Sequence, residues 1–234
     1  MTLLLDGLRR EMRQLANPDK AKLLQRFFKT GPGEYGEGDV FLGISVPQQR
    51  KFVRRYAALD LREIGSLLSG GVHEERLTAL LLLVNRFRKA APPEQRRIYT
   101  FYLKHTRWIN NWDLVDSSAP YIMGPYGDQA MLGKLARSGN LWERRISVLA
   151  TFHSIRLGDP RPALRIASLL LGDEHDLIHK AVGWMLREVG KRTSVANLET
   201  FLDRHCRAMP RTALRYAIER LPEARRRHYL AGGR

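Results

Sequence analysis

The sequence predicts an all-α fold, and three observations support this prediction. Apolar residues recur every three or four positions through most of the 234 residues, which is the period of an amphipathic helix. Most of these segments are about 10 to 16 residues long and end at Gly, Pro or Asn. No run alternates apolar and polar residues as the strands of a sheet do. Residues 40–46 could pair locally, but a single short strand has no partner.

The helices follow one another along the chain. Leucines repeat at helical spacing in residues 2–16 and 18–29, where Pro18 and Asp19 are typical of a first helical turn. Residues 30–46 hold five glycines and one proline and form a loop, and a loop of this length is typical of a functional or mobile segment. Residues 222–234 form a tail that is rich in arginine and that we expect to be mobile. Between loop and tail, the expected helices are 47–59, 61–68, 74–89, 93–106, 112–123, 128–137, 141–157, 162–171, 175–191, 194–207 and 210–221.

The charge of the chain favours a polyanionic partner. The sequence has 40 lysines and arginines against 24 acidic residues, a formal net charge of +16. Basic clusters displace the counterions that surround nucleic-acid phosphates. The charged N-terminal segment does not resemble a secretory signal, and Cys206 is the single cysteine, so we expect a cytoplasmic protein with neither disulfide nor structural zinc.

Charged residues open apolar helices at intervals of 29 to 40 residues, at Arg76, Asp116, Arg145, Lys180 and Arg211. This spacing is typical of helix-turn-helix repeats, and it predicts one domain over 1–234: a curved solenoid of HEAT-like repeats with a concave basic groove. The parts of this domain are the helix pair 1–29, the loop 30–46, the repeats 47–221 and the tail 222–234. Each slot could instead be an ordinary polar residue of a first helical turn. One acidic residue among four basic ones makes Asp116 the exception that needs an explanation.

Three tryptophans share a helical face with a charged residue three or four positions later: Trp112 with Asp116, Trp142 with Arg145 and Trp184 with Arg187. Each tryptophan could be a buried wedge between repeats. Three such pairs together favour a site for a cationic group on a polyanion, because aromatic faces attract cations and arginines bind phosphates.

Other candidate sites have weaker support. His175 and His179 stand at the spacing of a zinc-binding helix, but the motif has Asp in place of Glu and lacks a third ligand. Asp113 is expected to bind backbone amides in the first turn of its helix. Cys206 is expected to be a buried small apolar residue. The glycine-rich loop matches neither a P-loop nor a dinucleotide-binding motif, so nucleotide hydrolysis is not expected.

Three motifs, INNWDLVDSSAP from Ile109, LWERRISVLATF from Leu141 and HKAVGWMLREVGK from His179, resemble those of the AlkD-type alkylpurine DNA glycosylases. This family consists of HEAT-like repeats, and the resemblance covers nearly the whole chain. It implies that Asp116 is the catalytic carboxylate, that Trp112 and Trp184 are aromatic walls, and that Arg145 and Arg187 lie in the groove. Phe27 falls where the family can present a tyrosine, so its ring is available and the hydroxyl is absent.

The resemblance implies a monofunctional glycosylase that removes N3-methyladenine and N7-methylguanine from double-stranded DNA, with Asp116 stabilising the positively charged sugar and positioning water. Lys180, Arg76 and Arg211 join the two groove arginines as expected phosphate contacts. No cofactor or metal is expected, and the chain gives no signal for a dimer, so we expect a monomer. The alternative is a scaffold of the same fold that binds DNA or an acidic protein without catalysis. An RNA-binding repeat would need a base-reading side chain in every repeat, and none is evident.

Overall fold

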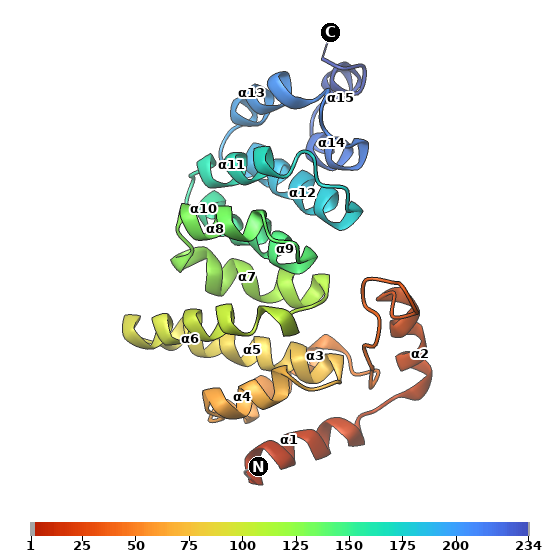
Figure 1. Ribbon diagram of the computed structural model, residues 1–234, viewed down its shortest axis with the longest axis vertical. Coiled ribbons are helices and arrows are strands. Elements are labelled where there is room, and N and C mark those ends of the chain that lie inside the picture. Colours follow the sequence, from red (N-terminus) through yellow and green to blue (C-terminus); the bar gives the residue numbers. More distant parts are fainter. Residues whose placement is uncertain (1–2, 234) are drawn as a thin grey trace. The chain divides into compact units, whose positions relative to one another are not determined.

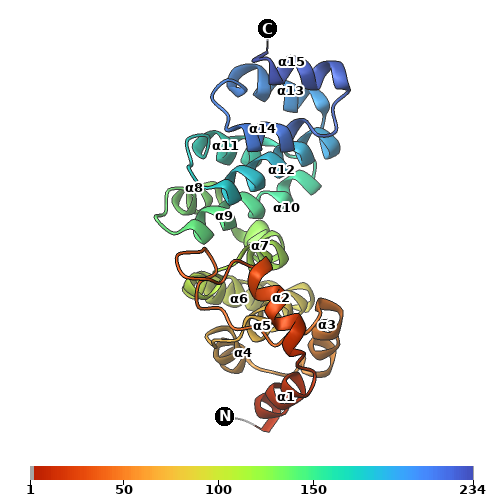
Figure 2. The ribbon, with the colours of Figure 1, turned by 90° about the vertical axis from the view of Figure 1, so that its right-hand side faces the viewer.

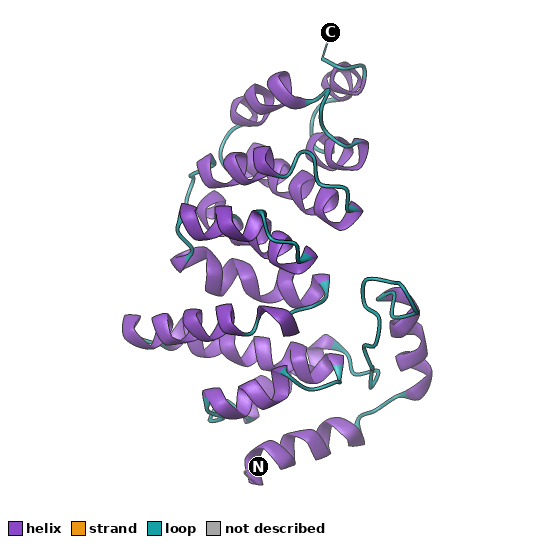
Figure 3. Cartoon of the chain, in the orientation of Figure 1, coloured by secondary structure: helices purple, strands orange, loops and turns teal. Residues whose placement is uncertain are grey.

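The structure is a computed structural model that describes residues 3–233, and every regular element in that range is a helix (Figure 3). The extended backbone in this range forms one isolated parallel bridge, between Val40 and Val72. The all-α prediction is confirmed. The chain divides into two compact units, Met1–Ser118 and Ala119–Arg234, and the boundary falls inside helix α7 (Trp112–Tyr126).

The first unit contains the helices that lead up to α7. They are α1 (Leu3–Gln14), α2 (Pro18–Phe27), α3 (Val46–Arg55), α4 (Leu61–Leu68), α5 (His73–Lys89), α6 (Pro92–Lys104) and the 3-10 helix η1 (Thr106–Trp108). Local capping fixes where several of them begin: the Asn17 side chain accepts a hydrogen bond from the amide of Lys20, and Asp60 forms a capping box with Glu63. Helix α5 packs against α3, α4 and α6, and its leucines fill the core (Figure 1).

The C-terminal end of the glycine-rich loop packs against α2 and α5. Phe28 and Phe41 are buried against each other, with ring centroids 5.1 Å apart. Gly43 has a φ of +83°, and a Cβ there would lie 2.3 Å from the carbonyl oxygen of Asn17. The Glu74 carboxylate accepts hydrogen bonds from the three successive amides of residues 42–44. Only glycine fits position 43, and the loop is held close to α2 and α5 (Figure 2).

The second unit contains α8 (Gln129–Ala136), α9 (Leu141–Ala150), α10 (Phe152–Arg156), α11 (Arg161–Leu169), α12 (Asp176–Arg192), α13 (Val195–His205), α14 (Arg211–Ile218) and α15 (Glu223–Leu230). Helix α12 packs against α9, α11, α13 and α14. Its closest approach is to α14, where a Cβ on Gly183 would lie 2.4 Å from the carbonyl oxygen of Ala213. The single helix predicted over residues 141–157 is interrupted at Thr151, whose hydroxyl donates to the Val148 carbonyl at 2.6 Å.

The C-terminal tail differs from its prediction, because residues 223–230 form helix α15, which packs on α14 (Figures 1 and 2). Tyr229 is fully buried, and its hydroxyl donates to a carboxylate oxygen of Asp203 at 2.9 Å. Arg225 pairs with Glu199 at 2.7 Å. A buried tyrosine and an ion pair therefore hold in place a segment whose composition alone indicates mobility.

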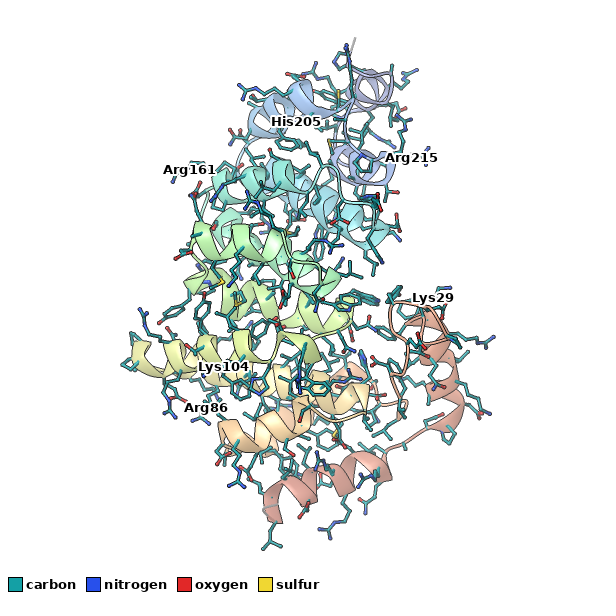
Figure 4. All side chains as sticks on the ribbon, in the orientation of Figure 1. Lys29, Arg86, Lys104, Arg161, His205 and Arg215 are labelled. Carbon is teal, nitrogen blue, oxygen red and sulfur yellow. The ribbon has the colours of Figure 1, made fainter. Side chains whose placement is uncertain are left out.

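Charged side chains cover the outside of both units. Lys29 and Lys104 in the first unit, and Arg161 and Arg215 in the second, are exposed, and Figure 4 labels their positions. Among residues 3–233, no helix combines the length and apolar character needed to cross a bilayer.

Candidate functional site

Trp112 in the first turn of α7 meets two phenylalanines at the end of α2, and one of these, Phe27, was also singled out from the sequence. Trp112 is half-buried and stacks on Phe28, with centroids 5.0 Å apart and planes at 14°. Phe27 meets Trp112 edge to face, with centroids 5.8 Å apart. Phe27 is 63% exposed, so it is an uncovered aromatic ring beside the indole.

Asp116 lies one turn after Trp112 on α7, and its side chain is partly exposed. The interior side of the helix is fixed nearby: the Tyr102 hydroxyl and the Ser118 hydroxyl lie 2.8 Å apart, and Ser118 donates to the Leu114 carbonyl at 2.6 Å. Burial raises the pKa of Tyr102, and the negative charge of Asp116 adds to this rise. Residue 116 therefore combines access to solvent with a rigid helical support.

Arg76 lies in the interior and not on a surface that phosphates could reach. It is 4% exposed, and its guanidinium donates to the Asp39 carboxylate and to the Asn110 side chain. Burial acts to raise the pKa of Asp39, but the hydrogen bond from His73 and the charge of Arg76 outweigh burial and hold that pKa below its usual range. The expectation that Arg76 contacts phosphate is wrong, because the side chain is buried and its guanidinium is bound to Asp39, a residue distant in sequence.

Arg145 has a similar structural role in the second unit. It is 5% exposed, and one guanidinium nitrogen donates to the Leu177 carbonyl at 2.6 Å, which ties α9 to the start of α12. Trp142, which shares its helix, is 6% exposed and belongs to the core. Position 145 therefore offers little of its guanidinium to a ligand, contrary to the groove contact that we expected.

Helix α12 presents three of the remaining candidates on one face. Lys180, Trp184 and Arg187 stand four and then three residues apart, the spacing of a single helical face. Each side chain is partly exposed. Both cations have carboxylate partners: Lys180 pairs with Asp176 at 2.7 Å, and Arg187 pairs with Glu219. The face offers an indole between two cations.

Arg211 is exposed on α14, and its guanidinium donates to the Leu230 carbonyl at 2.9 Å, so it also holds the terminal helix. The two histidines of the possible zinc motif have other partners. His175 accepts from the Leu177 amide at 3.1 Å as a helix cap, and His179 binds the Asp173 carbonyl at 2.5 Å. Within residues 3–233, no three His, Cys, Asp or Glu side chains are grouped as a metal site requires.

Comparison with known proteins decides the family. The sequence matches the family of DNA alkylation repair enzymes over residues 8–221, which is nearly the whole chain. This protein belongs to the DNA alkylation repair enzyme family. It therefore has a role in DNA repair. A search of the curated proteins finds no match to it.

The fold of this DNA alkylation repair family member is also found in a solved structure. That structure is described as a predicted DNA alkylation repair enzyme from Enterococcus faecalis and is 18% identical in sequence. The two superpose with a TM-score of 0.68, which covers 89% of this chain and 97% of the other. At this level of identity, the likeness concerns the helical fold.

Sequence reasoning missed a buried charged group in this DNA alkylation repair protein. His73 lies between two carboxylates: Nδ1 is 2.8 Å from Asp39 and Nε2 is 2.9 Å from Asp113. Asp113 also accepts from the Leu114 amide at 2.8 Å, as expected of a first-turn residue. A signal existed in the run HEER at residues 73–76, because four consecutive polar residues open the helix directly before its apolar run.

Proposed function

We propose that this protein is a monofunctional DNA glycosylase that hydrolyses the N-glycosidic bond of cationic alkylated purines in double-stranded DNA. The observation that carries the proposal is the arrangement on α7: the Asp116 carboxylate stands one turn from Trp112, and the exposed ring of Phe27 adjoins that indole. Membership of a DNA alkylation repair family supports the choice of substrate. The substrates in this proposal are N3-methyladenine and N7-methylguanine.

The chemistry needs few protein groups because the lesion supplies much of the activation. Alkylation at N3 or N7 makes the base cationic, so when the glycosidic bond breaks, the base takes the electron pair and leaves as a neutral molecule. The positive charge moves to the deoxyribose, which resembles an oxocarbenium ion. A carboxylate close to that sugar stabilises the developing charge and orients the attacking water. Water then supplies hydroxide to the sugar carbon, and its proton passes to Asp116 and on to solvent.

The aromatic rings have a matching role. Their faces attract positive charge, so Trp112 and Phe27 favour a sugar that becomes cationic over a neutral one. Phe27 acts through its ring alone, since it lacks the hydroxyl of the tyrosine that AlkD-type glycosylases can have at this position. The site has no evident acid to protonate a leaving group, which restricts the activity to bases that are already charged.

The face of α12 and Arg211 supply the phosphate contacts in this proposal. DNA phosphates would replace Asp176 and Glu219 as partners of Lys180 and Arg187. Each phosphate neutralised should lower the logarithm of the binding constant by about 0.9 per logarithm of salt concentration. Trp184, between the two cations, is available to pack on a sugar.

The substrate class is tested by incubating the protein with methylated duplex DNA and identifying the released bases by mass spectrometry. We expect N3-methyladenine and N7-methylguanine in the supernatant, and no hypoxanthine from a matched duplex that carries this neutral lesion. Binding of the methylated duplex without release of either base would instead favour the non-catalytic scaffold. Release of hypoxanthine at a similar rate would contradict the absence of a leaving-group acid.

A further inference from the structure

A group of buried charged side chains at the start of α5 has no part in the chemistry proposed above. His73, Glu74, Glu75 and Arg76 are consecutive, and none is more than 4% exposed. Buried charges persist only when they are paired or hydrogen-bonded. Glu74 accepts from the loop amides, and Glu75 pairs with an arginine of α1 at 3.1 Å. His73 is different, because its partners include the helix that carries Asp116.

The imidazole of His73 is enclosed on every side. Its two nitrogens face carboxylate oxygens of Asp39 and Asp113 at 2.8 and 2.9 Å. One ring face stacks on Phe41 with centroids 4.4 Å apart, and Phe28 lies at 5.0 Å with its plane tilted by 40°. The side chain of His73 is 2% exposed.

This geometry requires a charged ring. A neutral imidazole has a proton on one nitrogen only, so its other nitrogen would direct a lone pair at a carboxylate. Protonated on both nitrogens, the ring donates to Asp39 and to Asp113 at once. Burial alone would lower the pKa of His73, but the hydrogen bonds and charges of these two carboxylates outweigh burial and raise the pKa to about 9.

His73 contacts the beginning of α7 in two ways. It donates to Asp113, which directly follows Trp112 and comes one turn before Asp116. It also contacts Phe28, the ring on which Trp112 stacks. We infer that His73 is a positioning residue, which as an imidazolium holds the first turn of α7 and thereby sets the places of Trp112 and Asp116. This inference rests on the proposed glycosylase function.

The charged groups around His73 are balanced only when its ring is protonated. Asp39 faces it from the loop and Asp113 from α7, while Arg76 on α5 binds Asp39 from the other side. The remaining charge at this end of the loop, Glu74, is occupied by backbone amides. With His73 protonated, two cations meet two anions. Loss of the proton leaves two carboxylates facing one arginine, and the neutral ring can donate to only one of them. A lone pair then faces the other carboxylate, which weakens the hold on the first turn of α7.

The variant that tests this is Asp113→Asn. The two carboxylate oxygens of Asp113 accept separately from Nε2 and from the Leu114 amide, whereas the single amide oxygen of Asn can serve only one of these donors. The substitution keeps the size of the side chain and removes one negative charge. Removal of an opposite charge at this distance lowers a histidine pKa by about one unit or more. The matched control is Asp128→Asn, which replaces an exposed helix cap of α8 by another good cap.

The experiment measures single-turnover release of N7-methylguanine from one duplex at pH 6.5 to 9.5, and follows the ring nitrogens of His73 by NMR over the same range. We expect both nitrogens to carry protons at pH 7.5 in the unaltered protein. In Asp113→Asn, the midpoint of this titration and the alkaline decline in release should move down together by about one pH unit. The control should match the unaltered protein at every pH.

Two results would overturn the inference, and a third separates it from the proposed function. A neutral His73 ring at pH 7.5 contradicts the imidazolium. A titration that moves in Asp113→Asn while the pH profile of release stays unchanged shows that the ring does not position the reacting groups. If the unaltered protein binds the duplex but releases no base at any pH, the glycosylase function itself fails and the role of His73 falls with it.

Discussion

Raising the pH from 6.5 to 9 should lower the free energy of unfolding by about 3 kcal/mol through His73 alone. The pKa of this residue is about 9 in the folded protein and has its ordinary value of 6.5 in the unfolded chain. Between these values the folded state holds one more proton than the unfolded state. Stability is therefore complete below pH 6.5 and falls by about 1.4 kcal/mol for each pH unit until the ring titrates.

The assay is urea unfolding at half-unit steps of pH, followed by tryptophan fluorescence, for the unaltered protein, Asp113→Asn and the control Asp128→Asn. In Asp113→Asn the pKa of His73 is lower, so the decline should end about one pH unit earlier and be smaller by about 1.4 kcal/mol. The control should follow the unaltered protein. Parallel curves for all three proteins over this range would refute the claim that Asp113 stabilises a charged His73.

Three further changes probe the loop, the α12 face and the terminal helix. Gly43→Ala should lower the free energy of unfolding by about 3 kcal/mol and Gly33→Ala by about 1, because both have positive φ but only position 43 lacks space for a Cβ; equal urea midpoints would contradict this. Glu219→Gln should tighten DNA binding, measured by fluorescence anisotropy, by up to about fivefold, because the Glu219 carboxylate no longer competes with phosphate for Arg187. Unchanged affinity would place Arg187 away from DNA. Tyr229→Phe should cost about 1 to 2 kcal/mol in thermal unfolding, and no loss would mean that α15 is not docked through its hydroxyl.

Helix positions could be predicted because their signals are local. Pro18 and Asp19 mark the first turn of α2, a signal that needs only two neighbouring residues. The spacing that places Trp112 and Asp116 on one face of a helix is local too. These parts of the prediction depend on the helical period and not on the tertiary structure.

The buried charges could not be predicted, because their partners are distant in sequence. Arg76 and Arg145 follow the same local pattern as exposed basic residues, and nothing near them indicates that they are inside. The carboxylate that takes Arg76 belongs to Asp39, 37 positions away, and Asp113 is 40 positions from His73. Such pairing becomes visible only when the loop is folded onto α5. The prediction of a mobile tail was wrong for a similar reason, because Tyr229 donates its hydrogen bond to Asp203, which is 26 residues earlier in the sequence.

The most direct test of the whole account is the rate at which Asp116→Asn releases N7-methylguanine from a duplex with a single lesion, under single-turnover conditions. The substitution keeps the size of the side chain and removes the charge that faces the developing cation. We expect the rate to fall roughly 100-fold or more while the affinity for the same duplex stays within about twofold, because phosphate contacts carry the affinity. Release by Asp116→Asn at the rate of the unaltered protein would contradict the assignment of the reacting carboxylate to α7.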